Sequence, residues 1–163
     1  MLVLVSAVLG TYLAAPPSRV AAAPNTNDLL LLLGNRPEAP AQSFDTSEAA
    51  AAFLRTETAA RVAAPRLDGF SVTGAGIVET NAPVPFYQFS DGTVDLRIYA
   101  FTYAYLDRIA DEARLARPIL NRAAAQPVVQ PLGATTALVW RDRATVFLAF
   151  TEDTPAPLLD AIR

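Results

Sequence analysis

The chain has 163 residues, 52% of them hydrophobic, which is enough for one ordinary domain with a sizeable core. It contains no histidine, no cysteine and no lysine, and all thirteen basic residues are arginines. This composition excludes disulfides, zinc sites built from Cys and His, Ser-His-Asp triads and Schiff-base chemistry on lysine. The net charge is -3 at pH 7 and the arginines form no basic block, which argues against a nucleic-acid partner.

The chain opens with an uncharged apolar stretch, MLVLVSAVLGTYLAA, which ends at Pro16. A helix from Leu2 to Ala15 rises only about 21 Å, which is short against the roughly 30 Å of hydrocarbon in a bilayer. Two interpretations stay open: a retained membrane anchor over residues 1–15, and a signal peptide that is cleaved after Ala23. We favour the anchor, which predicts a protein of the bacterial inner membrane with its main domain in the periplasm.

Three small residues of this stretch are spaced four apart and share one helical face: Ser6, Gly10 and Ala14. Such a stripe lets a second helix approach closely, so we expect contacts there with other membrane-protein subunits, while the rest of the helix meets lipid. An alanine-rich chain can also carry such a stripe without any function, and that alternative stays open.

Residues 16–42 are rich in proline and small residues, and they predict an extended linker around one short leucine-rich helix. Either Asn27 or Asp28 can cap the start of this helix, and Gly34 ends it. Consecutive leucines on so short a helix cannot all face one side. Some must pack on the following domain, or contact a partner subunit or lipid. The candidate partner contacts are therefore Leu29, Leu30, Leu31, Leu32 and Leu33.

Residues 43–163 have the pattern of an α+β domain. A helix is expected from a capping box at Asp45–Glu48 to about Ala63, where Pro65 ends it. Short β-prone runs follow, with a hairpin turn at Asp91-Gly92. Apolar residues recur at helical spacing over about 102–125, which predicts a helical interruption of the sheet. The expected strands cover residues 70–73, 77–80, 86–89, 94–100, 135–140 and 145–150, and a last helix covers 155–162.

Together these elements predict a small antiparallel β-sheet with flanking helices, preceded by a short N-terminal membrane helix. Trp140 ends one of the expected strands, and as a large apolar side chain it is expected in the core.

Two stretches carry a resemblance to a known family. PRLDGFSVTGAGIVETNAPVPFYQFSDGTVDLRIYAF and, after a gap, LGATTALVWRDRATVFLAFTEDTPAPLLDAI resemble the periplasmic domain of membrane-bound bacterial anti-sigma factors. The resemblance spans roughly residues 47–162 without the helical interruption, and it implies the fold and the periplasmic side. The family also carries a cytoplasmic zinc-binding domain that grips a sigma factor. This chain has no histidine or cysteine for such a domain, so we do not expect sigma-factor binding.

The expected function is that of a non-catalytic accessory subunit, without cofactor or metal, that stabilises a larger inner-membrane complex, with a respiratory or photosynthetic assembly as a natural host. One alternative is a periplasmic sensor or regulatory domain related to anti-sigma factors. A second alternative is a small-ligand binder, whose candidate side chains are Glu79, Asp91 and Asp95.

Overall fold

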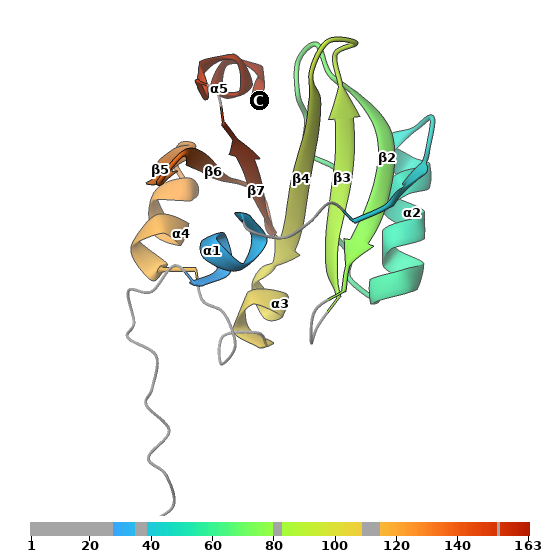
Figure 1. Ribbon diagram of the computed structural model, residues 1–163. Coiled ribbons are helices and arrows are strands. Elements are labelled where there is room, and N and C mark those ends of the chain that lie inside the picture. Colours follow the sequence, from blue (N-terminus) through green and yellow to red (C-terminus); the bar gives the residue numbers. More distant parts are fainter. Residues whose placement is uncertain (1–27, 35–38, 80–82, 109–114, 153) are drawn as a thin grey trace, which may run out of the picture.

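The structure is a computed structural model that describes residues 28–34, 39–79, 83–108, 115–152 and 154–163 (Figure 1). Its centre is a seven-stranded antiparallel sheet with the strand order β1-β2-β3-β4-β7-β6-β5. The strands are β1 (Ala41–Ser43), β2 (Ser71–Val78), β3 (Val84–Ser90), β4 (Asp95–Thr102), β5 (Val128–Leu132), β6 (Thr135–Asp142) and β7 (Thr145–Thr151). The helices are α1 (Asp28–Gly34), α2 (Ser47–Thr58), α3 (Tyr103–Arg108), α4 (Arg117–Ala123) and α5 (Ala156–Ala161).

The sheet consists of two meanders that meet in its middle. Strands β2, β3 and β4 follow one another by hairpins, and so do β5, β6 and β7. The turns use residues that tolerate a positive φ: Gly92 follows β3 at φ 91°, and Gly133 joins β5 to β6 at φ 71°. The chain leaves β4 at the centre, passes through α3 and α4, and returns at the far edge as β5.

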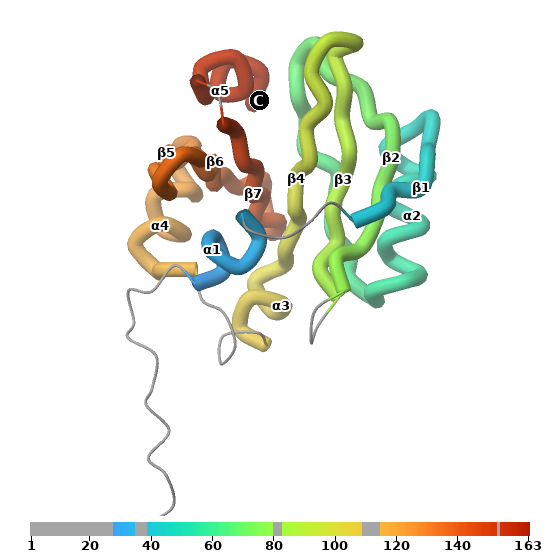
Figure 2. Tube along the Cα trace, viewed as in Figure 1, coloured from blue at the N-terminus to red at the C-terminus, as the bar shows by residue number. Residues whose placement is uncertain are grey.

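Helices cover both faces of the sheet, because successive residues of its central strands point to opposite sides. Along β7, Leu148 belongs to the core under α1, α3 and α4, whereas Phe147 belongs to the core under α2 and α5. Figure 2 shows α1 beside α4 and α2 on the other side of the sheet. The predicted α+β class, an antiparallel sheet with flanking helices, is confirmed.

Helices interrupt the sheet over 102–125, as predicted, but not as one continuous helix. The described residues form two short helices, α3 and α4, while Leu115 and Ala116 are not helical. Pro118 explains the start of α4, because a proline lacks an N–H and fits only the first turn of a helix. Strand β5 was not predicted, and it contains Pro131. As an edge strand it tolerates this proline.

Helix α2 begins one residue later than a cap at Asp45 would start it, and it ends earlier than predicted. Its cap is Thr46, whose hydroxyl accepts a hydrogen bond from the Ala49 N–H at 3.2 Å. It ends at Thr58 instead of near Ala63, because Ala59 adopts a left-handed conformation with φ 54°.

The runs predicted as two strands at 70–73 and 77–80 form the single strand β2, with an irregularity between Val72 and Gly74. The glycines of β2 leave space for backbone and side-chain atoms of neighbouring segments. A Cβ atom on Gly76 would lie 2.5 Å from the Phe86 ring and 2.6 Å from the Pro40 carbonyl oxygen. Strand β1 pairs with β2 at this position, so the folded part of the chain extends N-terminal of the predicted boundary at residue 43.

The predicted membrane helix over residues 1–15 lies outside the described residues. Among the residues that are described, no helix combines the length and the apolar character needed to cross a bilayer.

Trp140 is a core residue, as predicted, with 3% of its surface exposed and its ring 5.5 Å from that of Phe147. Replacing Trp140 with Ala should lower the free energy of unfolding by about 3 to 5 kcal/mol, because it leaves a large cavity. Urea titration of the purified protein measures this loss. Val94→Ala, at a position that is 47% exposed, is the control and should cost about 0.5 kcal/mol or less. Equal effects of the two variants would contradict the packing described here.

Ala59 holds a left-handed conformation that glycine adopts without steric cost. Ala59→Gly should therefore raise the free energy of unfolding by about 1 kcal/mol. The same substitution at Ala52, inside α2, should lower it by about 1 kcal/mol, because glycine is a poor helix former. Thermal unfolding of both variants checks the opposite signs, and a stability loss at Ala59 would contradict the end assigned to α2.

Candidate functional site

The leucine run predicted as a contact surface is largely part of the core. Leu29 and Leu30 are 0% exposed and Leu33 is 2% exposed, and all three pack under α4 and the sheet. These three predicted contacts are therefore corrected to core residues, because positions i, i+1 and i+4 share one helical face. Leu32 is partly buried, and Leu31 is 54% exposed on the opposite face. Ser6, Gly10 and Ala14 lie outside the described residues.

The acidic side chains considered for ligand binding do not form a site together. Asp91 accepts hydrogen bonds from the backbone N–H groups of Thr93 and Val94, each at 2.7 Å. These bonds stabilise the ionised carboxylate and lower the pKa of Asp91, which serves the turn between β3 and β4. Asp95 starts β4 opposite Ser90, and Glu79 follows β2. In the described ranges no group of three or more acidic, histidine or cysteine side chains could hold a metal ion.

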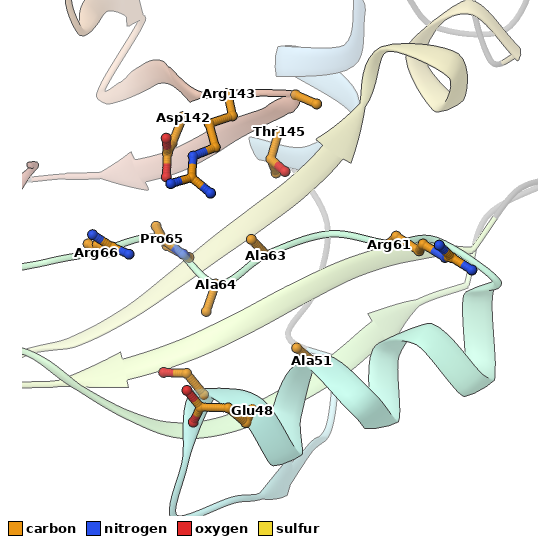
Figure 3. A pocket seen from close by; sticks show the side chains of 12 residues that line it. Glu48, Ala51, Arg61, Ala63, Ala64, Pro65, Arg66, Asp142, Arg143 and Thr145 are labelled. Atoms are coloured by element: carbon orange, nitrogen blue, oxygen red, sulfur yellow. The ribbon is translucent and has the colours of Figure 1, made fainter.

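A cleft lies elsewhere, between the first turn of α2, residues 61–66 and the turn from β6 to β7 (Figure 3). We call it the α2 cleft. Its volume is about 500 Å³, and alanine and proline side chains form much of its wall. Its charged lining consists of Glu48, Arg61, Arg66, Asp142 and Arg143.

One wall of the α2 cleft is held in place by a buried tyrosine. The Tyr87 hydroxyl donates a hydrogen bond to the Val62 carbonyl at 2.9 Å, and both residues belong to the core between α2 and the sheet. Burial strongly raises the pKa of Tyr87, because the phenolate would lose its hydration. This bond fixes the extended segment that follows α2, and with it the position of Arg61 and Arg66.

The opposite wall is the tight turn from β6 to β7. Arg143 adopts φ 52° in this turn, a conformation that costs a non-glycine residue free energy. Thr145 opens β7, and only 5% of its surface is exposed. Figure 3 shows the Thr145 hydroxyl pointing from β7 toward Ala63 and Ala64 across the cleft.

Comparisons with protein-family models, curated proteins and solved structures find no match for this chain. The resemblance to anti-sigma periplasmic domains therefore stays a prediction.

Sequence reasoning missed the α2 cleft, because its parts come from distant segments: Ser47 from a helix, Arg66 from an extended segment, and Arg143 from a hairpin turn. The one local signal of an unusual feature was Arg143, because it lies in a two-residue turn between strands, where glycine or asparagine is usual.

Tyr87→Phe should lower the free energy of unfolding by about 1 to 3 kcal/mol, because it leaves the Val62 carbonyl without its donor. The pH dependence should change as well. The unfolded tyrosine ionises near pH 10, whereas the folded one keeps its proton, so wild-type stability falls as pH rises above about 10. Urea titrations on either side of this pH should show a steeper fall for wild type than for Tyr87→Phe. Parallel curves would contradict the assignment.

Proposed function

We propose that the chain is a non-catalytic, membrane-anchored periplasmic accessory subunit that stabilises a larger inner-membrane protein complex. The observation that carries this proposal is the burial of α1. Leu29 and Leu30 are fully buried in the main core, so the segment that follows the apolar opening is part of the domain. The domain therefore starts only a short segment after the proposed anchor.

The length of the connecting segment supports a position near the membrane. The proposed anchor ends at Ala15, and α1 begins at Asp28. Even fully extended, the residues between them span at most about 40 Å. The domain would therefore stay within reach of the periplasmic surfaces of neighbouring subunits, and Leu31 of α1 is exposed and could contact them.

The short anchor also favours association with other helices. Its few strongly apolar residues supply only a few kcal/mol of insertion free energy. Close packing along Ser6, Gly10 and Ala14 would add van der Waals contact with a partner helix and retain the subunit in its complex.

A substitution at Gly10 separates a lone anchor from a docked one. Gly10→Leu raises hydrophobicity, which improves insertion, but it obstructs close helix packing. The variant should stay in the membrane fraction and leave the complex, as seen by native mass measurement after extraction in mild detergent. Ala15→Leu adds nearly as much apolar surface away from the stripe and should remain in the complex.

Two outcomes would contradict the proposal. The first is extraction of the wild-type protein as a free monomer of 17.4 kDa, and the second is a mature chain that begins at Pro24. Terminal sequencing decides the second point before any variant is made.

A further inference from the structure

The Thr145 hydroxyl is a buried polar group that lacks a hydrogen-bond partner among the described residues. The side chain is 5% exposed, and within the described ranges no hydrogen bond involves its hydroxyl. A buried hydroxyl without a partner costs free energy, so such groups are uncommon unless water or a ligand satisfies them. The hydroxyl points into the α2 cleft, where a ligand could reach it (Figure 3).

Positive groups surround the same space. In Figure 3 the Arg143 guanidinium extends from the turn into the gap above residues 63–65. Arg66 lies on the facing segment, and both arginines line the cleft. Ser47 lines it too, and it is the first residue of α2, a helix of 12 residues. The first N–H groups of a helix have no intrahelical partner and carry positive partial charge, which favours an anion there.

Two acids line the cleft as well, Glu48 and Asp142. They offset positive charge of the arginines that line the same walls, Arg61, Arg66 and Arg143. This balance suits a ligand with few negative charges better than a polyanion such as nucleic acid, which needs a concentrated positive face.

We propose that the α2 cleft binds a small organic ligand through a carboxylate or phosphate group, which accepts a hydrogen bond from the Thr145 hydroxyl and pairs with Arg143. A guanidinium offers two parallel N–H groups that match either oxyanion. A volume of about 500 Å³ accommodates a molecule of this class. The proposal does not depend on the accessory role, and either can fail without the other.

Calorimetric titration of the full-length chain in mild detergent tests the proposal, with citrate and inorganic phosphate as separate probes at constant ionic strength. Saturable one-to-one binding of at least one probe is expected, together with a rise in the melting temperature. The probe that binds tells a carboxylate site from a phosphate site. Failure of both probes to saturate the protein up to about 10 mM would overturn the proposal.

Two variants separate the site from the fold. Thr145→Val keeps the side-chain shape but removes the buried hydroxyl, and Arg143→Gly removes the guanidinium and relieves the strained turn. Each should raise the melting temperature of the ligand-free chain, yet weaken binding about tenfold or more. Loss of binding in a more stable protein cannot come from unfolding.

Two further variants complete the test. Arg122→Gln removes an arginine from α4, on the other side of the sheet, and should leave the affinity unchanged. Asp142→Asn removes a negative charge from the cleft and should tighten binding of the anion. A lower melting temperature for Thr145→Val, or binding that neither Thr145→Val nor Arg143→Gly weakens, would overturn the proposal.

Discussion

The pairing of β4 with β7 is the contact on which the rest of the structure depends. It joins the two meanders, and its central residues are buried on both faces, as in the pairs Tyr99 with Leu148 and Ala100 with Phe147. The backbone N–H and C=O groups of these buried residues have no access to water, so they must hydrogen-bond within the sheet. The same pairing sets Thr102 opposite Thr145, and this register decides where the turn from β6 to β7 lies.

The α2 cleft is a consequence of that pairing. One wall belongs to α2 and the segment after it, which pack on the first meander through Tyr87, while the other wall is the turn from β6 to β7 in the second meander, at Arg143. A ligand bound between these walls would contact both halves. It would stabilise their arrangement increasingly as the free ligand concentration rises above the dissociation constant, because binding only the folded state shifts the folding equilibrium.

The two proposed roles concern opposite faces of the sheet. The anchor would enter the domain through α1, in the core beneath α4, whereas the cleft lies by α2, on the other face of the sheet. The strands between them contribute side chains to both cores, as Leu148 and Phe147 do within β7. A structural change at one of these sites could reach the other only through this tightly packed sheet, because a close-packed interior transmits strain.

Local chemistry alone was enough to predict several features from the sequence. The alternation of apolar residues predicted the strand around Ile98, the Asp91-Gly92 dipeptide predicted its turn, and Trp140 was expected in the core. The α+β class followed from these elements. Each of these features depends on neighbours in the chain, which a sequence displays directly.

Only the tertiary structure decided the remainder. Whether the leucines of α1 face a core or a partner depends on which surface lies opposite them, and that surface comes from β6 and α4, about a hundred residues later. Tertiary contacts also ended α2 at Thr58, where the chain turns so that Val62 can accept from Tyr87. The α2 cleft was hidden for the same reason, since the fold alone brings Ser47, Arg66 and Thr145 together.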